Sequence, residues 1–175
     1  MLHAAHPREL ARGPETGNTL RMSNLTYSES IVINRAPEDL YDMVTDVTRI
    51  GEWSPICKAG WWDEGSTGQV GEWFTGRNVD GDTTWETRSE VVAASRGQEF
   101  AFVVGGSLVR WGYVFRPVDG GTEVTESWEF LPGGIAMFTD RFGDDAQKLI
   151  DGRTEAAHSG IPATLAALKR TAESE

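Results

Sequence analysis

The sequence predicts an α+β domain in which a curved antiparallel sheet of about seven strands packs against one long C-terminal helix. Between residues 25 and 131, short apolar stretches alternate with turn signals, a pattern typical of strands. From Phe138 to about Thr171, apolar positions recur every three or four residues, as on one helix. About 34 helical residues would extend roughly 50 Å, so this helix needs a sheet to lie on. We expect the space between helix and sheet to be the functional feature.

The N-terminal residues 1–22 mix proline, glycine, asparagine and charge without hydrophobic periodicity. We expect them to form a disordered extension that precedes a single domain at 23–175. A methionine stands at position 22, so translation can start at Met22 as an alternative to Met1.

The first strand is expected over Leu25–Asn34 and is followed by two short helices. Pro37 suits the first turn of a helix, where its missing N–H costs nothing, and two acidic residues follow it. Asp46 can cap the second helix. The remaining strands are expected at Ile56–Trp62, Val70–Val79, Asp82–Ala93, Gln98–Val104, Val109–Val118 and Gly121–Leu131.

The first hairpin is expected to turn at Asp80–Gly81, a strong two-residue turn signal. This turn would place Phe74 opposite Thr87 and Gly76 opposite Trp85. Alternation then separates a polar outer face, which includes Arg77 and Arg88, from an inner face. The inner positions of this hairpin are Phe74, Trp85, Thr87 and Val91.

The last hairpin, turning at Asp119–Gly120, carries the most informative inner face. The pairs predicted by that turn are Val109 with Phe130, Trp111 with Trp128, Tyr113 with Glu126, and Phe115 with Val124. A register slip of two residues would keep all eight on one face, so the face is more secure than the pairing. It is apolar except for the Tyr113 hydroxyl and Glu126.

The C-terminal helix is expected to run without a break from Phe138 to about Thr171. Its stripe comprises Phe138, Phe142, Ala146, Leu149, Ile150, Arg153, Ala156, Ala157, Ile161, Leu165 and Leu168. His158 lies on this helix, one turn before Pro162.

Composition excludes several classes of function. A net charge of −11 argues against a basic surface for nucleic acid. One cysteine, Cys57, excludes an internal disulfide and a multi-cysteine zinc site, and we expect neither metal nor cofactor. Cys57 is interpreted as a small buried residue. No apolar run matches a membrane span or a signal peptide, so a cytoplasmic protein without membrane insertion is expected.

The stretches SESIVINRAPEDLYDMVTDVTRIGEWSP (28–55), GTEVTESWEF (121–130) and GIPATLAALKRTAES (160–174) resemble the START-like (SRPBCC, helix-grip) superfamily. Within it, they are similar to the bacterial polyketide cyclase/dehydrase-type group. The resemblance implies a helix-grip fold, a sheet wrapped around the final helix with an apolar cavity between them. It also implies that members are enzymes, lipid or hormone carriers, or co-chaperone-like modules.

Glu126 is the main candidate functional residue, because a carboxyl on an apolar face must be partnered, protonated or hydrated. We hypothesise that it and Tyr113 reach the cavity as catalytic or ligand-binding groups; the alternative is a structural pair. The expected ligand-binding residues are Phe74, Trp85, Phe102, Trp111, Tyr113, Glu126, Trp128, Phe142 and His158, although the aromatic residues suit a plain core equally well.

Three functions remain open. The favoured one is binding of a small hydrophobic molecule, polyketide-, lipid- or polycyclic-like, because the inner face is poor in acid–base groups. The second is a cyclase or dehydratase that uses Tyr113 and Glu126 for proton transfer. The third is a ligand-free protein-interaction module, which predicts a filled core and an exposed apolar patch. A monomer and a homodimer are both compatible with the sequence.

Overall fold

One antiparallel sheet of seven strands, in the order β1-β7-β6-β5-β4-β3-β2, forms the scaffold of the computed structural model, which describes residues 25–175. The extension predicted at residues 1–22 lies outside the described residues. The strands are β1 Thr26–Ile33, β2 Cys57–Trp62, β3 Trp73–Asp80, β4 Thr83–Ser95, β5 Glu99–Val104, β6 Val109–Val118 and β7 Gly121–Phe130. The predicted seven-stranded antiparallel sheet is therefore confirmed.

Two short helices follow β1, as the sequence predicts. α1 spans Pro37–Thr45 and has its proline in the first turn. The second is a 3₁₀ helix, η1, at Val47–Glu52. The Oδ1 atom of Asp46 caps η1 by accepting the backbone N–H of Thr48 at 3.2 Å.

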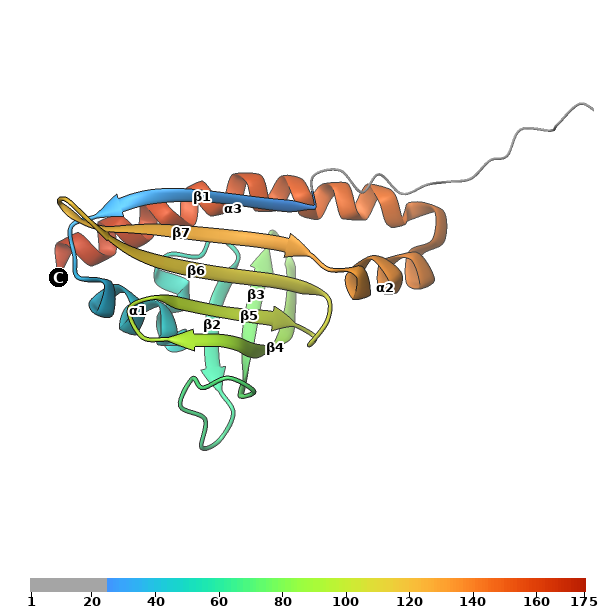
Figure 1. The fold of residues 1–175 in the computed structure, drawn as a ribbon. Helices are drawn as coiled ribbons and strands as arrows, with labels where there is room; N and C mark the ends of the chain where they lie inside the picture. Colours follow the sequence, from blue (N-terminus) through green and yellow to red (C-terminus); the bar gives the residue numbers. More distant parts are fainter. Residues whose placement is uncertain (1–24) are drawn as a thin grey trace, which may run out of the picture.

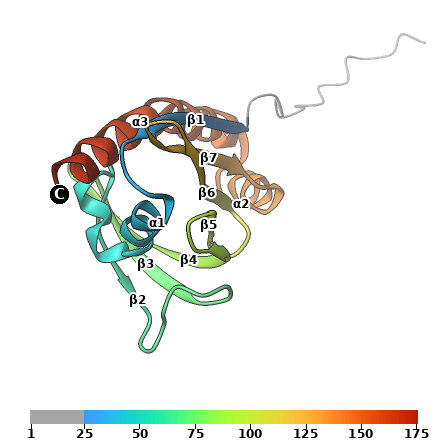
Figure 2. The same ribbon diagram turned by 60° about the vertical axis from the view of Figure 1, so that its left-hand side comes forward.

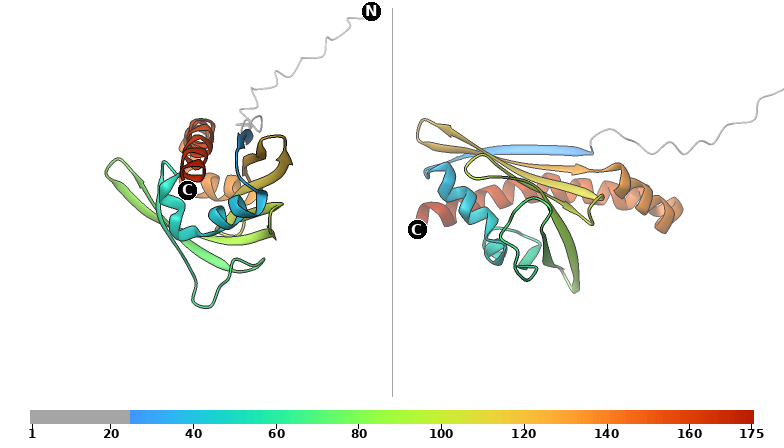
Figure 3. Two further views of the ribbon diagram at one scale, coloured as in Figure 1. Left: turned by 90° about the vertical axis from the view of Figure 1, so that its left-hand side faces the viewer. Right: turned by 60° about the horizontal axis from the view of Figure 1, so that its bottom comes forward.

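The long helix α3, Ala146–Ser174, lies along the edge formed by β1 and β7 (Figure 1). From that edge the sheet curls round to β2, with α1 inside the curve (Figure 2). The right-hand view of Figure 3 shows α3 running the length of the molecule, and the left-hand view looks nearly along its axis. The inner stripe of α3 is fully buried at Ile150, Ala157, Ile161, Leu165 and Leu168. This burial anchors the helix to the sheet and confirms the predicted fold class.

The prediction of one unbroken helix from Phe138 is wrong. A separate helix, α2, spans Pro132–Phe142, and a 3₁₀ turn, η2, spans Gly143–Asp145 before α3 begins. Gly143 has a φ of +52°, a conformation outside the right-handed helix, and the chain reverses there (Figure 1). Phe138 and Phe142 consequently lie on α2 and not on the long helix.

We expect Gly143→Ala to reduce the free energy of unfolding by about 1–2 kcal/mol, because a side chain strains a backbone with positive φ. No atom lies within 4 Å of the added Cβ, so backbone conformation alone would cause the loss. Gly152→Ala is the matched control: its Cβ is equally unobstructed, but Gly152 lies within α3. That change should stabilise the protein by about 0.5–1 kcal/mol. Urea unfolding measures both free energies. If the two substitutions changed stability in the same direction, the conclusion that Gly143 is required for its positive φ would be wrong.

The first hairpin has the predicted faces but not the predicted pairing. Phe74 pairs with Ser89 and Gly76 with Thr87, a slip of two residues from the expected register. The turn is formed by Gly81 and Asp82 instead of Asp80 and Gly81, with Gly81 at a φ of +55°. Because side chains alternate with a period of two, Phe74 and Val91 remain buried on the inner side.

The last hairpin has the predicted register throughout. Trp111 pairs with Trp128, and Tyr113 pairs with Glu126. Phe130, Val124 and Phe115 are also buried on this face. The inner face derived from the turn at Asp119–Gly120 is thus confirmed residue by residue.

Candidate functional site

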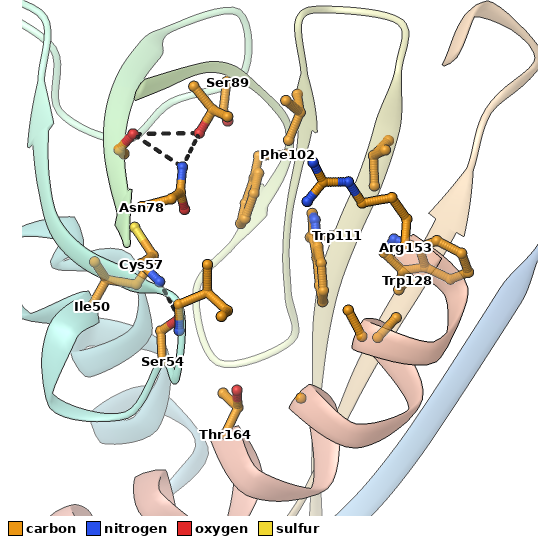
Figure 4. Close-up of a pocket in the computed structure, with 18 of the residues that line it drawn as sticks. Ile50, Ser54, Cys57, Asn78, Ser89, Phe102, Trp111, Trp128, Arg153 and Thr164 are labelled. Carbon is orange, nitrogen blue, oxygen red and sulfur yellow. Dashed lines mark hydrogen bonds between the residues drawn. The ribbon is translucent and has the colours of Figure 1, made fainter. Parts of the chain in front are cut away.

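A cavity of about 340 Å³ lies between the concave face of the sheet and α3 (Figure 4). Its volume is within the range of small-molecule sites. Most of its wall is apolar and much of it aromatic. The aromatic lining residues are Phe74, Trp85, Phe102, Trp111, Tyr113, Trp128, Phe130 and Phe138.

Seven of the nine side chains expected to contact a ligand line this one cavity. They are Phe74, Trp85, Phe102, Trp111, Tyr113, Glu126 and Trp128. The other two lie outside it. Phe142 is exposed near the end of α2, and His158 stacks on Tyr27 of β1 with ring centroids 4.1 Å apart. The helix break displaces Phe142, and the orientation of α3 turns His158 towards β1.

Tyr113 and Glu126 form a buried polar pair in the cavity wall. The Tyr113 hydroxyl donates a hydrogen bond of 2.9 Å to Oε1 of Glu126. The second oxygen, Oε2, is buried and has no partner among the described residues. Glu126 is 3% exposed and lines the cavity, so, within residues 25–175, Oε2 is a buried polar atom without a protein partner in the cavity wall.

The surroundings of this pair favour a neutral carboxylic acid. Burial raises the pKa of Glu126 to about 8, and the hydrogen bond from Tyr113 opposes this only in part. The pKa of Tyr113 lies well above its usual value, mainly because the side chain is buried and to a lesser extent because of the nearby charge of Glu126. At neutral pH, Glu126 therefore retains a proton that it can donate to an acceptor in the cavity.

A second group of polar side chains, Asn78, Thr87 and Ser89, lies on β3 and β4. The Nδ2 atom of Asn78 donates to Oγ1 of Thr87 at 3.2 Å, and Ser89 is buried (Figure 4). Cys57 lies close by and packs against Gly76 of β3. A side chain at Gly76 would crowd it, because an added Cβ would lie 3.1 Å from the Cys57 Sγ atom. Burial raises the pKa of the Cys57 thiol, which is therefore a weak nucleophile.

Sequence reasoning identified Thr87 as an inner residue but assigned no role to Asn78 or Ser89. Asn78 shares the alternation of Phe74 and Gly76, and Ser89 shares that of Thr87 and Val91. That parity is the signal that could have placed both in the cavity wall.

Arg153 is the most important lining residue that sequence reasoning did not assign to the site. Three lining residues are exposed, Pro55, Arg153 and Ala156, and they mark the mouth of the cavity. The Arg153 guanidinium lies over the ring of Trp85, 5.7 Å from its centroid. Arg153 is the only charged member of the apolar stripe of the long helix, and that exception was the available signal.

A curved antiparallel sheet around a C-terminal helix, with an apolar cavity between them, defines the helix-grip class of proteins. Residues 24–173 match the family model described as polyketide cyclase / dehydrase and lipid transport. The chain belongs to this family, and the resemblance noted from the sequence is confirmed. Membership supports a hydrophobic-ligand-binding or cyclase role.

Solved structures give the same fold. A polyketide-cyclase-like protein from Corynebacterium glutamicum is 47% identical, with a TM-score of 0.66, 85% of this chain covered and 91% of that one. A protein from Chromobacterium violaceum is 16% identical, with a TM-score of 0.63 and coverages of 87% and 99%.

A third similar structure is the di-domain ARO/CYC StfQ of the steffimycin biosynthetic pathway. It is 14% identical, with a TM-score of 0.63, and the match covers 86% of this chain and 51% of StfQ. This chain thus spans about half the length of that protein, and the likeness shows the fold alone. No curated protein matches the chain.

Among residues 25–175, no helix combines the length and apolar character needed to cross a bilayer.

Proposed function

We propose that the protein binds a small, flat hydrophobic molecule in the cavity and holds it through a hydrogen-bonding oxygen. The observation that carries the proposal is the unpartnered Oε2 of Glu126 in an aromatic wall. A buried polar atom without a partner is costly, and a ligand acceptor placed against it would remove that cost. The aromatic side chains supply the larger, less specific part of the contact.

A cavity of this size argues against the ligand-free interaction module, which requires a filled core. The aromatic lining suits planar rings better than a flexible chain, because Trp111 and Trp128 pair across β6 and β7. A polycyclic or polyketide-like ketone is therefore the ligand class that we favour.

The direct test compares fluorenone with fluorene, which has the same ring system without the ketone oxygen. Each is titrated against N-phenyl-1-naphthylamine, a neutral fluorescent probe for apolar sites. We expect wild type to prefer fluorenone about tenfold, the value of one good hydrogen bond to a buried group. Glu126→Met should abolish the preference, and Tyr113→Phe should weaken it. Equal affinities of wild type for the two compounds would contradict the role given to Glu126.

The second candidate function is a cyclase or dehydratase, favoured by the hydrogen-bonded pair and by the pKa of Glu126 near neutrality. Glu126→Gln separates the two candidates. Its amide can donate a hydrogen bond to a ketone but cannot transfer a proton. A binding protein would keep its affinity for fluorenone in this variant. An enzyme would keep the affinity and lose turnover of its substrate, and mass spectrometry of molecules bound to the natively purified protein would identify that substrate.

A further inference from the structure

Arg153 differs from most arginines in the described part of the chain. Six others pair with carboxylates: Arg49, Arg77, Arg88, Arg96, Arg110 and Arg116. Within residues 25–175, Arg153 has no such ion pair, although the chain contains 27 acidic residues. It is also the only positively charged side chain lining the cavity in that range. An unpaired guanidinium therefore lies at the mouth of an apolar site.

A cation–π contact with Trp85 positions this guanidinium, and within residues 25–175 no carboxylate forms an ion pair with it. The side chain extends from α3 towards the sheet, on the same side of the cavity as Trp111 and Trp128 (Figure 4). The guanidinium carbon lies over the Trp85 ring, 5.7 Å from its centroid, and a cation–π contact of this kind uses none of the N–H donors. A planar fork of N–H donors matches a carboxylate, which can accept two parallel hydrogen bonds.

Glu126 and Arg153 are the two ionisable acid–base side chains with opposite character among the polar residues that line the cavity. Glu126 is buried, whereas Arg153 is exposed. Among residues 25–175, no hydrogen bond or ion pair joins Arg153 to Glu126, whose bonded partner is the Tyr113 hydroxyl. Glu126 can satisfy a neutral oxygen, and Arg153 can satisfy an anion.

We propose that the ligand is a flat hydrophobic carboxylic acid whose carboxylate pairs with Arg153 at the mouth. Its ring system lies against the tryptophans, and its inner end carries the oxygen that meets Glu126. This inference rests on the proposed binding function and adds the charge of the ligand and the direction in which it lies.

The test uses 9-fluorenone-2-carboxylate and its uncharged analogue 9-fluorenone-2-carboxamide, each displacing N-phenyl-1-naphthylamine from the full chain. We expect wild type to bind the carboxylate about tenfold more tightly, a value at the lower end for charge-assisted hydrogen bonds because Arg153 is partly hydrated. In Arg153→Gln the ratio should fall to about one. Comparing the two compounds within each variant cancels any change in overall affinity. High salt should reduce the wild-type ratio, because the Debye length is about 3 Å at 1 M.

Arg141→Gln is the matched control. Arg141 also lies over an aromatic ring, that of Phe142 at 5.4 Å, but it does not line the cavity. Arg141→Gln removes the same net charge as Arg153→Gln. In this variant the tenfold preference for the carboxylate over the carboxamide should persist. If fluorenone and the neutral probe bind wild type but the carboxylate has no advantage, or keeps it in Arg153→Gln, this inference is wrong and the proposed function stands. If neither neutral compound binds wild type, the proposed function itself fails.

Discussion

Glu126→Gln is expected to make the protein more stable than wild type above pH 8 and about equally stable near pH 4.5. Burial raises the pKa of this carboxyl from 4.5 to about 8 in the folded protein. Between these values the folded protein holds a proton that the unfolded chain has lost. The contribution of Glu126 to stability is therefore fully present below pH 4.5 and is lost as pH rises through 8. Glutamine has the same shape and no proton to lose, so its variant avoids the loss.

The expected difference above pH 8 is about 3–5 kcal/mol, since each unit of pKa shift corresponds to about 1.4 kcal/mol. Urea unfolding of both proteins at several pH values measures it, and subtracting the two curves isolates Glu126 from every other titrating group. Glu129→Gln on the same strand is the control, because Glu129 is exposed. Its curve should run parallel to that of wild type. A parallel curve for Glu126→Gln as well would show that Glu126 is not desolvated in solution.

Ala157→Phe is expected to abolish binding of N-phenyl-1-naphthylamine, with a loss of at least about a hundredfold. Ala157 is 2% exposed and lines the cavity from α3, so an added ring enters the space that a ligand needs. Losing the burial of one aromatic ring costs about 3 kcal/mol, which corresponds to that factor. The fold should survive, because the ring fills open volume instead of overpacking the core.

Ala163→Phe provides the control, since Ala163 is exposed on the same helix and does not line the cavity. Fluorescence titration gives the affinities, and thermal melting confirms that both variants are folded. Unchanged binding by a folded Ala157→Phe protein would place the ligand elsewhere.

The sequence was most informative where geometry is local. The two-residue turn at Asp119–Gly120 determines the register of its hairpin. The pairing of Tyr113 with Glu126 therefore follows from counting residues away from the turn. In the other hairpin, aspartates stand on both sides of Gly81, and two overlapping turns are available. The structure uses the second, and only the pairing of the whole strands distinguishes them.

The remaining differences depend on tertiary structure. Apolar periodicity continues across Gly143 because α2 and α3 both direct apolar residues to one core, with Phe138 against Phe130 and Ala146 buried. Periodicity does not report a backbone φ, so the break at Gly143 was missed. The stripe position of Arg153 was visible, but its contact with Trp85 arises from the curl of the sheet towards a helix far along the chain.

The position of α3 also links the occupancy of the cavity to the order in which the domain is completed. The polar pair belongs to one hairpin and can form early, because its partners are 13 residues apart. The opposite wall of the cavity is complete only when α3, which follows all seven strands in the sequence, packs on β1 and β7. A molecule held between them stabilises the docked helix alone, so α3 would open less often in the loaded protein. A bound molecule and the docked C-terminal helix would therefore stabilise each other.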